Sequence, residues 1–442
     1  MSAATSEPAT PFHLRGNFAP VFDEVTLIDL PVTGALPPEL NGRFFRNGSN
    51  PRSGTSPHWF LGNGMLHGVR LERGRAVWYR NRYVRTPLLE NPNAGEIRAD
   101  GSSDPTASLA NTHVVCHAGK ILALEEGHLP WLVTPELDTV GAHDFGGKLA
   151  TAMTAHPRVC PATGELLFFG YGVVPPYLTY HRVAADGSLV QSEAITVRGP
   201  TMMHDFNVTR NHVVFMDLPM IFDLSRLAEG GIPIRWSDEY GARLGVMPRN
   251  GSDRDVVWHE IEPSYVFHPM NAYEDGDDIV IDVARFAKLA FSPEDGEGTP
   301  ARLHRWVIDR KRGKVREQPL DDRAADFPRV ADEVVGQKHR FGYMTGLGDI
   351  EAFGTHVFKY DLASGRSEAW ECGAGNAAGE AVFARAGRGE DEGYLLTFVY
   401  DAARDASDFV VIDAQRVAAG PVARVQLPRR VPFGFHGSWI AD

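Results

Sequence analysis

Four short histidine segments, spread over most of the chain, limit the possible folds more than any other feature. They are Thr-Ala-His156-Pro, Met-Met-His204-Asp-Phe, Val-Phe-His268-Pro-Met-Asn and Phe-Gly-Phe-His436-Gly-Ser-Trp. Neutral imidazole is a good ligand for iron, copper, nickel and zinc. Residues so far apart can share one metal only where distant strands converge, so a metal site here requires a radial or deeply convergent architecture.

Spacing alone does not establish such a site. The chain has 17 histidines, and a lone histidine is more often a surface residue or a satisfied core residue than a ligand. The metal-ligand interpretation therefore depends on the residues around each histidine.

Short apolar or alternating runs, bounded by glycine, proline, aspartate or asparagine, recur along the chain and are typical of strands joined by turns. The clearest runs cover residues 113–117, 121–124, 164–171, 212–216, 278–283 and 393–400. Helical periodicity is scarce, and Asp223–Glu229 is the best candidate. With 45 glycines and 30 prolines arguing against long helices, we expect an all-β protein.

Many short antiparallel strands, with ligands arriving from distant segments, suit a β-propeller, whose blades present inner strands to a central axis. No clean repeat at a fixed period is present. From the strand pattern alone, a large β-sandwich stays open as the alternative.

Composition argues against several kinds of partner. The net charge is -13 and no basic run occurs, which argues against a nucleic-acid partner. Cys116, Cys160 and Cys372 form no C-x-x-C pair, and so sparse a set fits a reducing cytoplasm. Residues 1–15 are polar and proline-containing, with no signal-peptide pattern, and are expected to form a disordered lead.

No stretch approaches the ~18 consecutive apolar residues of a spanning helix. We therefore expect a cytoplasmic protein. Apolar loops around Met220-Ile-Phe and Pro175-Pro-Tyr could touch a membrane surface, and without a basic patch this peripheral contact should be weak.

The histidine contexts occur together with further motifs in a fixed order. These are Leu-Asn-Gly-Arg-Phe-Phe-Arg-Asn-Gly-Ser-Asn-Pro (residues 40–51), His58-Trp-Phe-Leu-Gly-Asn-Gly-Met-Leu-His67-Gly, Ala-Asn111-Thr-His, Ala155-His156-Pro, His204-Asp-Phe, Phe267-His268-Pro-Met-Asn-Ala and Phe435-His436-Gly-Ser-Trp. In this set and order the chain resembles, nearly end to end, the carotenoid cleavage oxygenases. That family, which includes retinal pigment epithelial membrane protein-like, lignostilbene and isoeugenol oxygenases, contains non-haem iron enzymes that split carbon–carbon double bonds.

The resemblance implies a seven-bladed β-propeller with a helical and loop cap over an axial metal site, formed here by residues 16–442 as a single domain. It also implies that an Fe(2+) ion is held by four histidines as its only protein ligands. Those positions correspond to His156, His204, His268 and His436.

The resemblance further implies three acidic residues that orient the ligating imidazoles. Glu126 and Glu380 match the family pattern, whereas Asp326-Phe-Pro stands where the family usually has a glutamate. The shorter carboxylate of Asp326 is expected to reach its histidine through water or to leave it free. A ligating imidazole needs an acceptor for its other ring N–H, which is the physical reason for such acids, although acids in loops are more commonly only solvated.

The ligand set implies the chemistry. Four neutral histidines favour the ferrous state, and an octahedral ion keeps two positions open for O2 or water. By resemblance, O2 adds across one alkene of a bound apolar substrate, and two carbonyl products result. Thr112 aligns with a family position near the open site, where its methyl group could restrict access, although a plain strand threonine is the simpler interpretation.

Substrate class depends on one position. Family members that cleave 4-hydroxystilbenes and isoeugenol-like phenols tend to carry lysine directly before the first of the three acids, where it can bind a phenolate. This chain has Glu125 there. A carotenoid or apocarotenoid is therefore the expected substrate, with a stilbene or phenylpropene as the alternative. Strand alternation predicts that Glu125 and Glu126 point to opposite sides.

Several aromatic residues could line a tunnel for an apolar substrate, since such ligands are held mainly by burial. The candidates are Tyr83, Tyr171, Tyr177 and Tyr180, whereas Phe206, Phe267 and Phe435 are expected to pack around the metal ligands. For each of them, ordinary core or cap packing is the alternative.

Two other classes of protein fit a propeller. A hydrolase or lactonase would use calcium or zinc with carboxylate and asparagine ligands, which the acidic segment Tyr273–Asp278 superficially offers. That segment also has the spacing of a hairpin turn. A non-catalytic binding propeller would need no metal.

Overall fold

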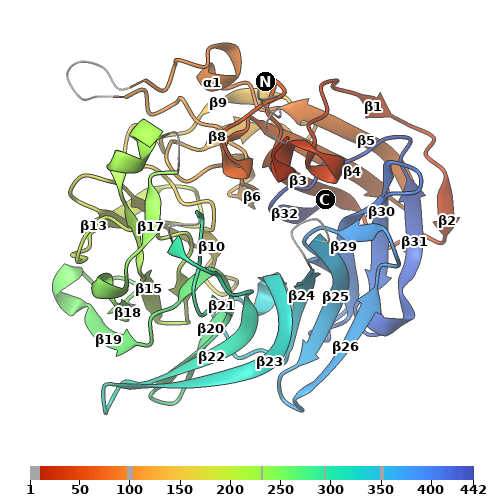
Figure 1. The fold of residues 1–442 in the computed structure, drawn as a ribbon. Helices are drawn as coiled ribbons and strands as arrows, with labels where there is room; N and C mark the ends of the chain where they lie inside the picture. The colour runs from red at the N-terminus through yellow and green to blue at the C-terminus, as the bar shows by residue number, and fades with distance from the viewer. Residues whose placement is uncertain (1–9, 97–102, 230–231, 293–294, 349–352) are drawn as a thin grey trace, which may run out of the picture.

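The computed structural model describes residues 10–96, 103–229, 232–292, 295–348 and 353–442. Its sheets are arranged as blades around one axis (Figure 1). Five blades are separate sheets, and two more share β23 (Lys314–Arg329), whose first part pairs with β22 (Arg302–Asp309) and whose last residues pair with β24 (Phe341–Leu347). The fold is therefore the expected seven-bladed propeller, not a sandwich.

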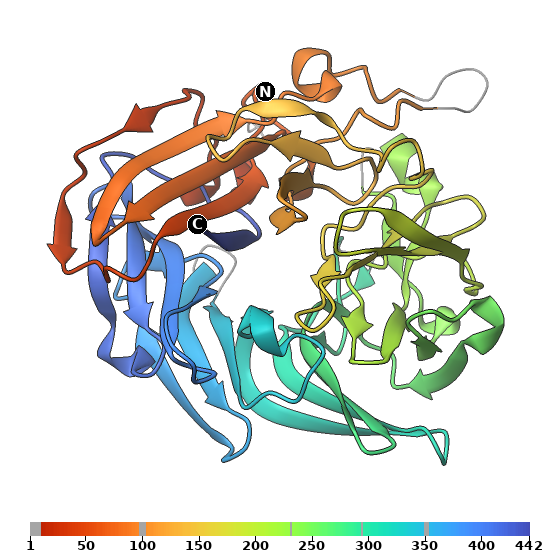
Figure 2. The same ribbon diagram turned by 180° about the vertical axis from the view of Figure 1, so that it is seen from behind.

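Each blade is an antiparallel meander whose innermost strand lies near the axis (Figures 1 and 2). Two blades contain strands from both ends of the chain; from the inside outward, one is β32 (Gly437–Ala441), β3 (Gly42–Ser49), β4 (Gly64–Glu72), β5 (Arg75–Tyr83) and β1 (Thr26–Leu27), and the other is β27 (Asn376–Ala378) with β28 (Val382–Arg385), then β29 (Gly393–Asp401), β30 (Ala406–Asp413), β31 (Pro421–Gln426) and β2 (Val32–Gly34). Three blades have four strands in order from the inside outward: the first is β6 (His113–His117), β7 (Lys120–Leu124), β8 (Trp131–Val133) and β9 (Thr139–Ala142), the second is β10 (Arg158–Val159), β11 (Leu166–Tyr171), β12 (Leu178–Val183) and β13 (Leu189–Ala194), and the third is β14 (Asn207–Val208), β15 (His212–Asp217), β18 (Ala242–Pro248) and β19 (Val257–Ile261). The two blades that share β23 are β20 (Tyr265–Asp275), β21 (Asp278–Phe286), β22 and β23, and the end of β23 with β24, β25 (Phe353–Asp361) and β26 (Arg366–Glu371).

Helical structure in the described residues is short. The one α-helix there is α1 (Pro87–Glu90), and a small hairpin, β16 (Met220–Phe222) with β17 (Ile234–Trp236), extends from the ring. The 3-10 turns are η1 (Phe12–Leu14), η2 (Gly16–Phe18), η3 (Trp59–Leu61), η4 (Leu224–Glu229), η5 (Asp238–Tyr240), η6 (Asp253–Asp255), η8 (Asp332–Val334) and η9 (Val417–Ala419). None of these helices is long and apolar enough to cross a membrane.

The six expected runs are strands, because each alternates or buries apolar side chains between turn residues. The expected helix at Asp223–Glu229 forms only the 3-10 turn η4, and the acidic segment Tyr273–Asp278 is the β20–β21 hairpin turn. Of the expected disordered lead, residues 1–9 lie outside the described part. Within the rest of that segment, residues 12–14 form η1, and His13 is buried.

The ring closes between the two ends of the chain. The last strand, β32, pairs with β3 near the amino terminus, from Gly42 with Ala441 to Arg46 with Gly437. A second early strand, β2, pairs with β31. Because each of these sheets is completed by a segment from the opposite end of the sequence, the circular arrangement is fastened at two places (Figure 1).

The hydrophobic core is divided among the spaces between neighbouring blades. In one of them Phe44 of β3 lies 5.4 Å from Phe398 of β29 and 5.3 Å from Phe409 of β30, measured between ring centroids. In another, Leu124 of β7 and Phe168 of β11 belong to one cluster. A blade thus buries both faces, and the axis is left to the residues that begin the inner strands.

Candidate metal centre

The four histidines meet on the propeller axis because each lies shortly before an innermost strand or near its start. His156, His204 and His436 lie just before β10, β14 and β32, and His268 lies within β20. The same position in the next two blades carries Asp326, near the end of β23, and Glu380, between β27 and β28. In the remaining blade it carries Thr112, just before β6.

The imidazoles face one another through their Nε2 atoms. Nε2 of His204 lies 2.9 Å from Nε2 of His156 and 3.3 Å from Nε2 of His268, and the candidate ligand atoms of all four histidines lie within 4.8 Å of one another. With metal–nitrogen bonds of about 2.1 Å, adjacent ligand atoms on an octahedral ion lie about 3.0 Å apart. The donor set fits a metal ion, and among the described residues it is the one cluster of histidine, cysteine or carboxylate ligands that does.

Three of the imidazoles are held from behind by a carboxylate at Nδ1, which leaves Nε2 free for the metal. The pairs are His204 with Glu126, His268 with Asp326 at 2.9 Å, and His436 with Glu380 at 3.0 Å. Asp326 therefore contacts His268 directly, whereas its shorter side chain had been expected to need water or to leave the histidine free.

Backbone irregularities explain how Asp326 reaches that far. The pairing of β23 with β24 shifts register after Asp326, and Phe327 has a left-handed backbone with φ of 53°. The pairing of β20 with β21 shifts between Val266 and Pro269, on either side of His268. Such bulges re-aim single side chains, and here each bulge carries a residue of the centre.

His156 is held differently, through Asp205, which was not among the residues expected at the site. Its Nδ1 lies 3.5 Å from Oδ2 of Asp205, and the same oxygen accepts a 2.6 Å hydrogen bond from Arg158. Burial raises the pKa of Asp205 to about 6, with Arg158 opposing that rise. The adjacency of Asp205 to His204 was the available signal, but its contact with His156 arises only in three dimensions.

At two of the four candidate ligands the surroundings favour the neutral imidazole. Burial, followed by the neighbouring histidines, lowers the pKa of His156 and of His436 far below its usual range. Burial also opposes the charged form of His204, but Glu126 outweighs it and raises that pKa. Glu126 in turn accepts a 2.6 Å hydrogen bond from Tyr171. Burial and Glu126 raise the pKa of Tyr171 far above its usual range, so the hydroxyl stays protonated and donates.

Aromatic side chains form a wall beside the histidines. Phe267 meets His204 edge to face at 5.0 Å, and Phe327 stacks on His268 at 5.0 Å. Around these two residues lie Phe60, Phe291, Phe353, Phe435 and Trp59, each in ring contact with another member of the group. This aromatic wall, defined by these seven residues, is apolar on the side that approaches the centre. Of these seven residues, only Phe267 and Phe435 were expected beside the ligands; Phe327, Phe353, Phe60, Phe291 and Trp59 were not.

The other candidates differ in their distance from the centre. The carbonyl of Thr112 accepts the N–H of His436, and its hydroxyl donates to Asn111. Phe206 is fully buried against Phe169, and its backbone N–H donates to Asp205. Tyr83 packs in a separate cluster, with its hydroxyl bonded to Asn50, so the structure does not bring it to the histidines.

The three tyrosines of the segment 170–180 also differ in whether they contact the centre. Tyr171 reaches the centre through Glu126, whereas Tyr180 is fully buried in the core between two blades. Tyr177 is half-buried in the loop before β12.

Glu125 and Glu126 follow the end of β7, so strand alternation does not apply to them, and they have different partners. Glu125 accepts hydrogen bonds from His128 at 2.8 Å, from the N–H of Gly127 at 2.8 Å and from Ser108 at 3.1 Å. Burial opposes ionisation of Glu125, but these hydrogen bonds outweigh it and lower the pKa of its carboxyl. The position therefore carries a negative charge near neutral pH.

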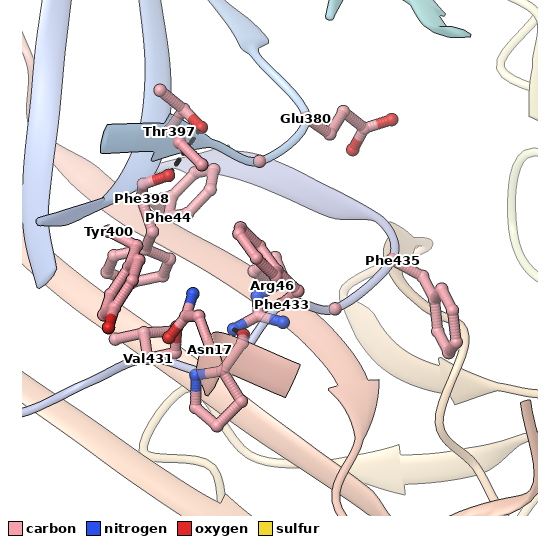
Figure 3. Close-up of a pocket in the computed structure, with 14 residues that line it drawn as sticks. Asn17, Phe44, Arg46, Glu380, Thr397, Phe398, Tyr400, Val431, Phe433 and Phe435 are labelled. Carbon is pink, nitrogen blue, oxygen red and sulfur yellow. Dashed lines mark hydrogen bonds between the residues drawn. The ribbon is translucent and has the colours of Figure 1, made fainter. Parts of the chain in front are cut away.

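A small cavity of about 20 Å³ lies behind Glu380 (Figure 3). Its wall includes Arg46, whose guanidinium donates a 2.7 Å hydrogen bond to the carbonyl of Pro432 and packs so closely on Gly434 that a Cβ there would overlap it. Burial lowers the pKa of Arg46 to about 10, so the guanidinium remains charged. This contact fixes the segment that leads to His436.

Comparison with known proteins agrees with this geometry. The model of the retinal pigment epithelial membrane protein family matches residues 18–441. A carotenoid cleavage oxygenase of Mycobacterium tuberculosis is 37% identical and the alignment covers 99% of both chains. Carotenoid 9,10(9',10')-cleavage dioxygenase 1 of Arabidopsis thaliana is 35% identical, covering 99% of this chain and 91% of the relative.

Among solved structures, the lignostilbene dioxygenase of Pseudomonas brassicacearum superposes with a TM-score of 0.89 at 29% identity, over 99% of this chain and 100% of that one. Fold, histidine cluster and sequence similarity thus point the same way. The chain belongs to the carotenoid cleavage oxygenase family, the family of the retinal pigment epithelial membrane protein.

Proposed function

We propose that the protein is a non-haem Fe(2+) dioxygenase that cleaves one carbon–carbon double bond of a carotenoid or apocarotenoid. One alkene and one O2 give two carbonyl products, so no reducing cosubstrate is needed. The observation that carries the proposal is the cluster of four histidines, whose Nε2 atoms converge and three of which have a carboxylate within hydrogen-bonding distance of Nδ1.

His156, His204, His268 and His436 would hold the iron. When bound there, ferrous iron supplies a redox-active centre with open positions for O2. Iron is preferred to zinc because zinc has no redox chemistry, and to calcium because all four donors are neutral imidazoles, whereas calcium takes oxygen ligands. The calcium-dependent lactonase alternative loses support for the same reason.

The chain's own residues contribute orientation and exclusion of water. Glu126, Asp326 and Glu380 accept hydrogen bonds from the Nδ1–H groups and so keep each imidazole in the tautomer that presents Nε2 to the metal. The aromatic wall offers a polyene a large apolar surface, and a site of this kind binds its ligand mainly by burial. Phe267 and Phe327, which touch ligating histidines, are the residues closest to the reacting double bond in this proposal.

Glu125 favours carotenoids over phenols. A phenolate would meet the negative charge that Ser108, Gly127 and His128 stabilise there, with no lysine to bind it. A stilbene or phenylpropene is the second candidate, because the Pseudomonas brassicacearum neighbour is named as a lignostilbene dioxygenase.

We also infer a weak peripheral contact with membranes, where such apolar substrates reside. Val173 and Val174 are 41% and 69% exposed, and Leu224 is 55% exposed. The loop that carries the two valines directly follows Tyr171, whose ring lies 6.1 Å from Phe222. With no basic run in the sequence, binding would rely mainly on apolar area. Cosedimentation with neutral vesicles, compared between the native protein and Val174→Asp, measures it.

The activity is tested by anaerobic iron titration, followed by exposure to O2 with apocarotenals, resveratrol and isoeugenol. We expect one iron per chain and mass-spectrometric products from the polyenes only. His268→Ala should lose iron and activity, whereas His143→Ala, at the outer edge of a blade, should keep both. Cleavage of the phenols alone would overturn the substrate assignment, and absence of iron binding would overturn the proposal.

A further inference from the structure

We propose that a chamber on the propeller axis, below the histidines, binds one small, singly charged carboxylate or oxyanion such as formate, acetate or bicarbonate. The chamber has a volume of about 310 Å³. At about 30 Å³ for each water molecule, that volume holds about ten waters or a small organic anion with its hydration. This site is distinct from the aromatic wall, and its occupation does not depend on which alkene the enzyme cleaves.

The chamber lies on the other side of the histidines from the aromatic wall. Phe267 and Phe435, which precede two of the ligands, belong to that wall. Pro157, Pro269 and Ser438, which follow three of the ligands along the inner strands, belong to the chamber. Because the inner strand of each blade starts at the histidine level, residues further along these strands line the axis beneath it.

Two guanidinium groups in the chamber wall have unused donors. Arg329 makes no side-chain hydrogen bond within the described part of the chain, and its closest carboxylate oxygen, on Glu380, is 3.6 Å from Nη1. Arg158 donates one hydrogen bond, to Asp205. Their side chains are only 16% and 22% exposed. A partly buried guanidinium with free N–H groups is suited to a carboxylate, which accepts two parallel hydrogen bonds.

Asn207 supplies an independent indication. Asn207 is 2% exposed and belongs to the chamber wall. Neither its amide nitrogen nor its amide oxygen has a hydrogen-bond partner among the described residues. Burying such a group unpaired costs about 1–3 kcal/mol. A polar occupant that both accepts from and donates to the amide would remove that cost, and bicarbonate or a hydrated carboxylate can do both.

The other charged residues that line the chamber limit its ligand to one negative charge. Glu333 is an ion-pair partner of Arg385, with 2.6 Å between them. Asp332, the other carboxylate of the wall, has no ion pair within the described residues, and it would repel a multiply charged anion. The wall therefore favours a monoanion over phosphate or sulfate at neutral pH.

An anion here would also be coupled to the metal centre. Arg158 contacts Asp205, which lies beside His156, and Arg329 lies beside Glu380, which holds His436. An anion that draws either guanidinium into the chamber weakens its hold on that carboxylate. Coupling between two binding sites is reciprocal, so iron affinity and anion affinity should change by the same factor.

The test is calorimetric titration of the iron-loaded protein with formate, acetate and bicarbonate at constant ionic strength set by sodium chloride. We expect one saturable site per chain for at least one of these probes, and at least tenfold weaker binding of phosphate. Asn207→Leu keeps the side-chain size and removes no hydrogen bond of the described structure, so it should fold and weaken binding at least tenfold. Arg329→Met should abolish it, and Arg316→Met, on an exposed outer strand, should bind as the native protein does.

Two results would overturn the inference. One is the absence of saturable binding by all three monoanions. The other is binding that Asn207→Leu and Arg329→Met leave unchanged, which would place the anion on the iron instead. Because the readout is anion binding rather than alkene cleavage, the inference can fail while the proposed function stands.

Discussion

Individual hydrogen bonds at Nδ1 decide whether the four histidines act as one ligand set. Asp326 is the most informative of the acceptors, because it reaches His268 directly although its side chain is one carbon shorter than the family's glutamate. The N–H of Phe327 donates to the same oxygen at 2.8 Å, so the bulge that redirects the chain also fixes the carboxylate. Backbone geometry thus compensates for side-chain length.

Removing that acceptor should weaken iron binding. We expect Asp326→Ala to raise the dissociation constant for iron by about 10–100-fold, since loss of a ligand-orienting acceptor typically costs this much. Asp322→Ala, on the same strand but exposed, is the matched control and should bind as the native protein does. Anaerobic titration measures both, and equal affinity of the three proteins would contradict a role for Asp326.

A charge change at position 125 should shift substrate preference. In Glu125→Lys we expect the ratio of resveratrol to apocarotenal cleavage to rise at least about tenfold, because one charge-assisted hydrogen bond contributes about 1.5 kcal/mol. Glu125→Gln removes the charge without adding a donor for phenolate and should change the ratio less. Competition assays with both substrates present provide the ratio, and an unchanged preference would remove Glu125 from the specificity argument.

At the scale of elements, turns and bulges set the positions of the blades. The acidic β20–β21 turn, which superficially offered calcium ligands, is a hairpin whose Glu274 fastens the neighbouring blade. Its carboxylate accepts hydrogen bonds from Thr209 at 2.6 Å, from His212 at 2.8 Å and from both the backbone and side chain of Asn211. Its role is therefore to connect two blades.

This network predicts a pH dependence of stability. Burial would raise the pKa of Glu274, but the hydrogen bonds from Thr209, His212 and Asn211 outweigh it and lower that pKa from 4.5 to about 2. A carboxyl with a depressed folded-state pKa stabilises the fold fully above its unfolded pKa. That contribution is lost as the pH falls from about 4.5 towards 2.

We therefore expect Glu274→Gln to lower the free energy of unfolding at pH 7 by about 1–3 kcal/mol and the difference from the native protein to shrink below pH 4. Urea unfolding at pH 7, 5, 4 and 3 measures it. Glu297→Gln, an exposed control, should follow the native curve. A constant difference across this range would show that the charge of Glu274 contributes nothing.

For the whole molecule, closure of the ring couples the two chain ends to the metal centre. The backbone of His436 is bonded to Asn47 of β3 and to Thr112 before β6, and β32 continues directly from it. One ligand thus depends on pairing between residues almost 400 positions apart. Pairing of β32 with β3 therefore positions His436 in the metal centre as well as completing the sheet.

Deletion of residues 437–442 should therefore remove iron binding and the cooperative thermal transition together, since it leaves β3 unpaired along one edge and His436 at a free end. Asp442→Asn is the control, because the exposed ion pairs of Asp442 with Arg70 and Arg43 contribute at most about 1 kcal/mol. Calorimetry and iron analysis of the two variants test this expectation. A truncated protein that melts in one transition and still binds iron would contradict it.

The sequence by itself determined the parts that depend on local pattern. Alternation and turn residues located the strands, and the local context of His156, His204, His268 and His436 identified the candidate ligands. The helix expected at Asp223–Glu229 is only a 3-10 turn at Leu224–Glu229, because so short a segment fits the residue spacing of an α-helix and of a 3-10 helix equally well. The aromatic wall was found only in part, since most phenylalanines of such a chain pack in cores.

Only the tertiary structure decided contacts between blades. The proximity of Asp205 to His156, the direct reach of Asp326, the position of Phe327 on His268 and the axial chamber with Arg158, Arg329 and Asn207 join residues from different sheets. The alternation of side chains along a strand predicts on which face of the sheet each residue lies. It carries no information about which strand of another blade packs against that face. Ring closure and the bulges of β20 and β23 supply that information, because they set where each inner strand begins on the axis.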